Sequence, residues 1–353
     1  MSFNRIVLTG LTALAGLGIA SEANAGGRNP GSLLLYPEFD NRDTVVTVLT
    51  VTNTNDDFTP SAANPNVPNG TVRVEFKYIG KYGAFNGPSG PFGGSNVINC
   101  EEFNREELLT PNDTLTLITN AHNPQHEQGY VYVFAKNVAG EKIAFNWLIG
   151  NVITVSGMLG FEYGVNPVAF DGIGDGTLTD LDGDGHCDLD GVEYGEVADE
   201  ILIPRFFGQR NEGFNSELIL VALSGGAAFT TTVDFLIYND NEEVFSSEYT
   251  FDCWDRVNLL DISGLFAQSF LNLFTNNDPQ ELLGTNGSIE TGWMRIDGAI
   301  ADSTVQSIDD PAFYAVLLEK IGETRGASDL PFEQGLQSNG ALLPRSIFGD
   351  TDA

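Results

Sequence analysis

Basic residues are scarce in this chain. It has 16 Lys and Arg against 49 Asp and Glu, and its formal net charge is −33 at pH 7. A surface of this sign repels nucleic-acid phosphates and anionic lipids and attracts cations. We therefore expect no nucleic-acid partner. The hydrophobic share of 42% is normal for a folded chain and argues against disorder despite the charge.

Long apolar runs are also few. The longest follows Arg5 and extends over residues 6–20, which falls short of the roughly 20 residues that a membrane-spanning helix needs. The tripeptide Ala23-Asn24-Ala25 then has the small-x-small pattern of a signal-peptidase site. Residues 1–25 are therefore predicted to be a secretory signal peptide. We expect a protein that does not span a membrane and is secreted or held at the cell surface, with the periplasm as an alternative.

Cysteine is limited to Cys100, Cys187 and Cys253. So few cysteines exclude a disulfide-dense mini-scaffold, and hydrophobic cores must supply most of the stability. Cys100 and Cys253 occupy matching places in the repeat described below. They either pair across an interface or are buried separately as small hydrophobic residues, and the sequence leaves both alternatives open. Cys187, in an acidic loop, is expected to be the odd, exposed thiol.

The order of sequence features in the first half of the chain recurs in the second. Residues 71–78 alternate apolar and polar side chains with a period of two, which is typical of a half-buried strand, and residues 231–238 repeat the pattern. The other corresponding pairs are 34–39 with 202–206, 45–53 with 217–223, 130–134 with 293–296, 144–149 with 313–318, and 167–170 with 330–332.

This recurrence predicts an all-β protein of two tandem immunoglobulin-like antiparallel β-sandwiches that arose by internal duplication. The alternative is that unrelated β domains share a loose pattern. The expected organisation is a signal peptide at 1–25, a first sandwich at 26–170, an acidic calcium-loop linker at 171–199, a second sandwich at 200–322 and a C-terminal tail at 323–353.

Between the two copies, acidic residues alternate with glycine in a short loop. Ca²⁺ takes roughly six to eight oxygen ligands, and carboxylates spaced two apart on a tight loop converge on one point. Such an ion would neutralise the clustered charge and hold the sandwiches at a fixed angle, whereas the alternative is a solvated acidic linker. The predicted ligands are the side chains of Asp180, Asp182, Asp184 and Asp188, the backbone carbonyl of His186, and either Asp190 or Glu193.

The D-x-D-G-D-G-x-x-D-L run of this loop resembles the calcium loops of integrin-type FG-GAP repeats, dockerins and thrombospondin type 3 repeats. The resemblance covers only about 12 residues, the length of an EF-hand loop. The run departs from an EF-hand because its twelfth position is Gly191 and not Glu. The resemblance implies a weak, structural, extracellular site.

Signals for catalysis are few. His122 and His126 are four residues apart, a spacing that would place two metal ligands on one face of a helix. Pro124 lies between them, so we expect two exposed loop histidines instead. The chain has neither a Gly-x-Ser-x-Gly elbow nor a phosphate-binding loop. Because acids are abundant, a carboxylate pair carries no information about glycoside hydrolysis. We expect no enzymatic activity.

The Leu-Leu-Tyr-Pro-Glu-Phe-Asp start, the Val-Leu-Thr-Val-Thr-Asn segment and residues 109–115 resemble uncharacterised exported bacterial β-sandwich proteins. This resemblance implies a location and an architecture only. Our first hypothesis is a secreted or cell-surface calcium-stabilised binding or adhesion protein whose partner is an extracellular protein or glycan, or another copy of the chain. The alternatives are a structural subunit of an extracellular layer or filament, with sandwich edges pairing between chains, and a secreted enzyme.

Overall fold

The computed structural model describes residues 29–341 except 43, 63, 84–95, 158–159, 174–178, 180–186, 210–213, 240–241, 275–289, 305, 322–323 and 328–330. The predicted signal peptide lies outside the described residues. Most described residues are in β-strands, which form four sheets with antiparallel pairing. The predicted all-β class is confirmed.

Two sheets come from the first half of the chain. Their orders are β4-β3-β6-β1-β9 and β5-β2-β7-β8, which we call large sheet 1 and small sheet 1. The elements are β1 (Leu33–Asp40), β2 (Val45–Asn53), β3 (Val72–Gly83), β4 (Asn96–Leu109), β5 (Thr114–Ile118), α1 (Thr119–His122), β6 (His126–Lys136), β7 (Leu148–Ser156), β8 (Gly160–Val165) and β9 (Val168–Phe170).

The second half forms large sheet 2, with the order β13-β12-β15-β10-β19 and β16 paired to β15, and small sheet 2, with the order β14-β11-β17-β18. Its strands are β10 (Glu200–Phe207), β11 (Phe214–Ala222), β12 (Thr230–Asn239), β13 (Val244–Phe251), β14 (Trp254–Asn258), β15 (Thr291–Asp302), β16 (Ser307–Asp309), β17 (Phe313–Ile321), β18 (Thr324–Ala327) and β19 (Phe332–Gln334). Its helices are η2 (Gly226–Ala228), α2 (Leu259–Ile262), η3 (Gly264–Phe266) and α3 (Gln268–Phe274).

The two halves have the same strand order, with β1 to β6 matching β10 to β15 and β7, β8 and β9 matching β17, β18 and β19. Their irregularities match as well. The β1–β6 register shifts after Tyr36 and the β10–β15 register shifts after Ile203, with Pro37 and Pro204 inside the shifts. Proline has no N–H to donate to a ladder, so bulges are where a sheet accommodates it. The repeated order supports the interpretation of an internal duplication.

The strand order matches an immunoglobulin domain only at its centre. There, strand B pairs with E and strand C with F, as β2 pairs with β5 and β3 with β6 here. The first and last strands are exchanged between the sheets, because β1 lies beside β6 and β7 lies beside β2. The resemblance to that fold is therefore limited to the four central strands.

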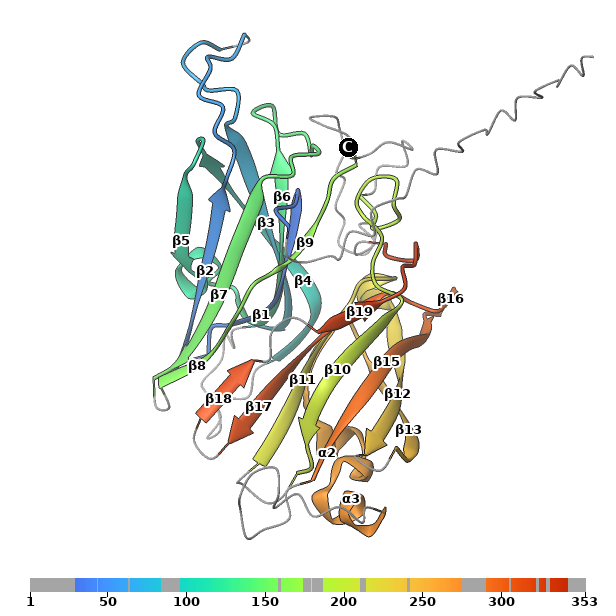
Figure 1. Cartoon of the computed structure of the whole chain (residues 1–353). Coiled ribbons are helices and arrows are strands. Elements are labelled where there is room, and N and C mark those ends of the chain that lie inside the picture. The colour runs from blue at the N-terminus through green and yellow to red at the C-terminus, as the bar shows by residue number, and fades with distance from the viewer. Residues whose placement is uncertain are drawn as a thin grey trace, which may run out of the picture.

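The four sheets are stacked in the order small sheet 1, large sheet 1, small sheet 2 and large sheet 2 (Figure 1). In β2 burial alternates along the strand, so one face is covered, whereas every residue of β1 is buried. In β11 the consecutive residues Leu218 to Val221 are all inaccessible. Strands β1 and β11 are thus covered on both faces, since each belongs to a sheet in the middle of the stack.

The boundaries of the second sandwich differ from the prediction. Strands β18 and β19 pair with β17 and β10, so the sandwich continues to Gln334, beyond the expected limit at residue 322. The described part of the predicted linker 171–199 is also packed. Leu189 and Tyr194 are fully buried, and the Tyr194 ring meets Phe134 of large sheet 1 edge-on with centroids 6.1 Å apart.

Candidate functional site: the contact between the two sandwiches

The two sandwiches meet where small sheet 2 packs on large sheet 1. Residues 252–256, which form the end of the turn after β13 and the start of β14, make most of its specific bonds. We call them the docking segment. Strand β14 is held on one side by β11, in register from Val221 opposite Trp254 to Glu217 opposite Asn258. Its side chains therefore project from a fixed sheet, not from a loop.

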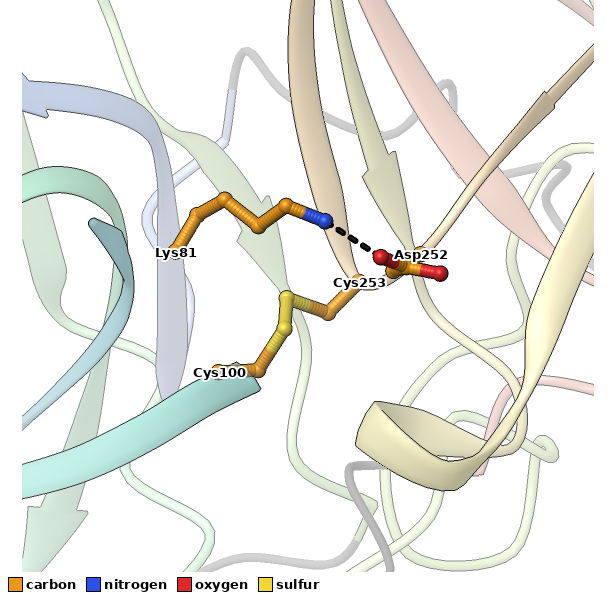
Figure 2. The surroundings of a disulfide bond; sticks show 4 residues. All are labelled: Lys81, Cys100, Asp252 and Cys253. Atoms are coloured by element: carbon orange, nitrogen blue, oxygen red, sulfur yellow. Dashed lines mark hydrogen bonds and ion pairs between the residues drawn. A yellow bond between two sulfur atoms is a disulfide. The ribbon is translucent and has the colours of Figure 1, made fainter. Parts of the chain in front are cut away.

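A disulfide bond joins Cys253 of the docking segment to Cys100 of β4 (Figure 2). Their Cα atoms are 6.3 Å apart, and both residues are fully buried. Beside them, the Lys81 ammonium donates to Asp252 Oδ2 at 2.5 Å (Figure 2). Of the two alternatives that the sequence leaves open for these cysteines, the structure has the pair. Cys187 is outside any disulfide, and it is buried where an exposed thiol was expected.

The places of the two cysteines are not equivalent in the repeat. Cys100 lies within β4, whereas Cys253 follows β13, the counterpart of β4. The bond therefore joins two different surfaces of the repeated unit. A pair of equivalent residues related by a twofold axis would join the same surface twice.

Trp254 makes the second bond of the docking segment. Its side chain is 1% exposed, and its indole Nε1–H donates to the carbonyl of Pro37 at 2.8 Å. Pro37 lies in the register shift of β1, where the ladder with β6 is interrupted. The bulge in the first sandwich thus presents an acceptor to the second, and the buried indole has the partner that it needs.

Arg256 makes the third bond, to acidic residues of both sandwiches. Its Nη1 lies 3.1 and 3.2 Å from the two carboxylate oxygens of Glu38 in β1. Its Nη2 lies 2.9 Å from Glu162 Oε1 in β8, and its Nε lies 2.8 Å from Glu217 Oε2 in β11. The Tyr163 hydroxyl donates to Glu38 on the other side. One guanidinium on β14 therefore contacts three other strands, β1 and β8 of the first sandwich and β11 of the second.

Burial determines the electrostatics of this cluster. It raises the pKa of Glu38, and the charge of Arg256 opposes that rise. Burial alone would lower the pKa of Arg256, but the surrounding carboxylates outweigh it and raise the pKa. The guanidinium stays protonated and compensates acids that would otherwise be buried at high cost. Arg256 is thus required for the contact to bury Glu38 and Glu162, whose side chains are 0% and 4% exposed.

An open polar cleft of about 570 Å³ lies beside Arg256, between the sandwiches. Arg42 at its rim is held by Asp40, with Nη2 2.6 Å from Oδ2. Both arginines of the cleft are thus compensated by carboxylates of the protein. The lining residues are Arg42, Tyr82 and Gln128 from the first sandwich and Glu217, Trp254, Asp255, Arg256, Asn258 and Asp261 from the second.

Of the predicted calcium ligands, Asp180, Asp182, Asp184 and His186 lie outside the described residues. In the described part, Asp190 Oδ1 accepts from the N–H groups of Val192 and Glu193, and Glu193 Oε2 accepts from Asp188 N–H at 2.8 Å. These bonds fold a turn at the end of the acidic loop. Within the described residues no group of three or more His, Cys, Asp or Glu is placed to hold a metal ion. The calcium site stays a prediction.

The two histidines predicted to be exposed are not loop residues on the surface. His126 is 2% exposed and begins β6, where its ring packs against Gly80. Burial lowers its pKa to about 4. His122 ends α1, and its Nδ1 is hydrogen-bonded to the Tyr78 hydroxyl at 2.8 Å. The prediction was wrong because the aromatic side chains of β3 and β4 cover this turn, so both rings serve in packing.

The Arg256 cluster was not predicted from the sequence. One signal for it was present, because Glu38 stands within the apolar run Leu33–Asp40, and a carboxylate in such a strand needs a cation. The sequence does not show which of the 16 basic residues supplies it.

Comparison with protein-family models, with curated protein sequences and with solved structures found no match to this chain. Among the described residues, no helix has the length and apolar character needed to cross a membrane.

Proposed function

We propose that the protein is a secreted or cell-surface, calcium-stabilised binding or adhesion protein, without catalytic activity, whose two sandwiches act as one rigid body. The observation that carries the proposal is the docking segment. A disulfide, a buried indole hydrogen bond and a buried ion cluster join the sandwiches within five consecutive residues. Such a contact resists both sliding and separation, which suits a protein that transmits force or presents surfaces at fixed positions.

The disulfide also supports export. Disulfides form and persist outside the reducing cytosol, in secreted, periplasmic or surface proteins. A buried bond between sandwiches is a permanent part of the fold, not a transient redox pair. It agrees with the signal peptide that the sequence predicts at residues 1–25.

Calcium belongs to the proposal through the acidic loop. Thr179 and Cys187, which flank residues 180–186, are both buried, and their side chains meet at 3.9 Å. Thr179 also contacts the buried Tyr194 hydroxyl at 3.2 Å. The base of the loop is therefore closed and anchored on large sheet 1, a favourable arrangement for ligands that must converge. The docking segment already holds the sandwiches together, so calcium would stabilise the loop and its anchor.

The proposal is tested by co-sedimentation of the mature chain with envelope fragments of the cells that produce it, in millimolar calcium and in chelator. We expect retention in the pellet with calcium and a smaller retained fraction in chelator. A protein that remains in the supernatant under both conditions contradicts the proposal. A variant with Asp182→Ala and Asp184→Ala should behave in calcium as the wild type does in chelator.

A further inference from the structure

The contact inside the chain joins two different surfaces of the repeated unit. The outer face of large sheet 1 receives the outer face of small sheet 2. Because the two sandwiches have the same topology, one surface of each kind is left at the ends of the stack. These are the outer face of small sheet 1 and the outer face of large sheet 2 (Figure 1). A contact of this head-to-tail kind can be repeated between molecules.

On the outer face of small sheet 1, strands β2, β5 and β7 carry no charge, and we call this part the neutral face; the fourth strand, β8, has Glu162 in the contact with Arg256. Strands β2, β5 and β7 contain no Asp, Glu, Lys or Arg, in a chain of net charge −33. Exposed β-branched apolar side chains stand on it, with exposed fractions of 37–49%. Two cross-strand threonine pairs lie beside them. The outward residues are Val46, Val48, Thr50 and Thr52 of β2, Thr114, Thr116 and Ile118 of β5, and Ile149, Asn151, Ile153 and Val155 of β7.

The neutral face is the counterpart of the face that small sheet 2 buries against the first sandwich. Thr114 pairs with Thr52 as Trp254 pairs with Val221, and both β5 and β14 run directly into a short helix. By this register Thr116 stands at the position of Arg256. A small hydroxyl residue thus replaces each of the two large side chains of the docking segment.

The outer face of large sheet 2, which we call the acceptor face, is the counterpart of the surface that receives the docking segment. By the matching registers, Trp293 stands at the position of Tyr130, and Leu202 at that of Leu35. The Trp293 ring stacks on Tyr238 with centroids 4.1 Å apart. The exposed apolar residues of this face are Leu236, Val244, Trp293 and Phe332.

We propose that a second copy of this chain packs its neutral face on the acceptor face of the first, repeating between chains the contact that joins the sandwiches within one chain. The inference rests on the proposed function and names the partner of the adhesion protein. Each such contact leaves one neutral face and one acceptor face free, so assembly continues into a linear filament. Adhesion and the formation of an extracellular filament would then be one activity.

Charge and position both favour a copy of the chain as the occupant. Two molecules of net charge −33 repel, and the neutral face is a surface on which a second copy can approach without adding like charges. The acceptor face has acids, of which Glu200 is paired with Arg295. Assembly should therefore strengthen as salt screens the remaining repulsion, over a Debye length of about 8 Å at 0.15 M.

The contact between chains would be weaker than the one within the chain. The register that aligns Thr114 with Trp254 places Asp113 at the position of Cys253, so no disulfide forms there. In the same register Thr114 replaces Trp254 and Thr116 replaces Arg256, so the indole hydrogen bond and the buried ion cluster are also absent from the contact between chains. A reversible association that depends on protein concentration is expected.

The test is the size distribution of the mature protein, measured by sedimentation velocity and light scattering over a range of concentrations at about 0.15 M salt. Wild type should grow beyond a dimer as concentration rises. Ile153→Lys on the neutral face and Leu236→Lys on the acceptor face should each stop growth. Both side chains are more than a third exposed, so folding should be kept, and circular dichroism checks this. Val138→Lys, in the exposed turn that follows β6 and outside the strands of both faces, is the matched control and should assemble like wild type.

Mixing the two face variants separates head-to-tail packing from other arrangements. Each variant keeps the face that the other lacks, so an equimolar mixture should form a one-to-one dimer and stop. The proposal is overturned if wild type stays monomeric at every concentration, or if neither variant alters growth. Dimers that only Ile153→Lys abolishes would mean that the neutral face pairs with itself, which also overturns it. A monomeric protein that still sediments with envelopes would contradict this inference and leave the proposed function standing.

Discussion

Arg256 of the second sandwich and Glu38 of the first form a buried ion pair, with Nη1 and Oε1 3.1 Å apart. Their side chains are 9% and 0% exposed. An ion pair in this position is costly to desolvate, so we infer that its value lies in specificity, because Glu38 and Glu162 of the first sandwich must both meet the guanidinium.

Replacing Arg256 should weaken the contact between the two sandwiches and lower the stability of the protein. Arg256→Met leaves Glu38 and Glu162 buried without a cation, so we expect a loss of about 3–5 kcal/mol in the free energy of unfolding. Urea titration followed by tryptophan fluorescence measures it. The control is Arg205→Met, which breaks the pair with Glu319 at a side chain that is 56% exposed and should cost less than about 1 kcal/mol. Equal losses in the two variants would contradict the role given to Arg256.

The disulfide should add stability without being needed for the contact. Cys100→Ser with Cys253→Ser removes a link that closes a loop of 153 residues, and we expect a loss of about 2–5 kcal/mol. The Trp254 and Arg256 bonds remain, so the small-angle scattering profile should keep the dimensions of the stacked sandwiches. Cys187→Ser is the control for losing a buried thiol. An expanded, two-lobed profile for the double variant would show that the bond alone holds the contact.

The contribution of Glu333 in β19 to stability should rise as pH falls from 8 towards 5. Burial raises the pKa of this carboxyl from 4.5 to about 7. The protonated form is favoured in the fold, so its contribution is complete below the unfolded pKa and is lost as pH rises through about 7. Glu333→Gln should remove up to about 3 kcal/mol of this dependence. Unfolding midpoints measured across the range check it, and an unchanged slope in the variant would contradict it.

Calcium should bind to the acidic loop without moving the sandwiches. We expect a calorimetric binding signal that Asp182→Ala with Asp184→Ala abolishes. Asp56→Ala with Glu242→Ala removes the same charge from two exposed positions outside the acidic linker and should keep the signal. Scattering should stay the same from chelator to millimolar calcium, because the docking segment sets the geometry. A calorimetric calcium-binding signal that remains in the variant with Asp182→Ala and Asp184→Ala would show that calcium binds at another site.

The repeated architecture was accessible from the sequence because its strands carry local signals. Residues 71–78 alternate with period two, and β3 and its counterpart β12 form at the expected places. The exchange of β1 and β7 between sheets was not accessible, since it depends on pairings across long stretches of chain. Strands β18 and β19 are only four and three residues long, too short to show a period.

The contact between the sandwiches was the hardest part to predict. Arg256 lies 218 residues from Glu38 and 94 from Glu162, so no spacing rule connects them. Which basic residue becomes buried depends on how the sheets stack, and this is a property of the tertiary fold. The sequence identified Cys100 and Cys253 as a possible disulfide pair, but whether they pair depends on how the two sandwiches pack.

The burial of Cys187 bears on how the disulfide persists. Rearrangement of a disulfide requires a thiolate that can reach one of its sulfur atoms. Cys187 is buried beside Thr179, and Leu189, two residues further on, pairs with Gly340 near the end of the described chain. In the folded protein its thiol is therefore kept from the Cys100–Cys253 bond, and the covalent link between the sandwiches is shielded from exchange within the chain.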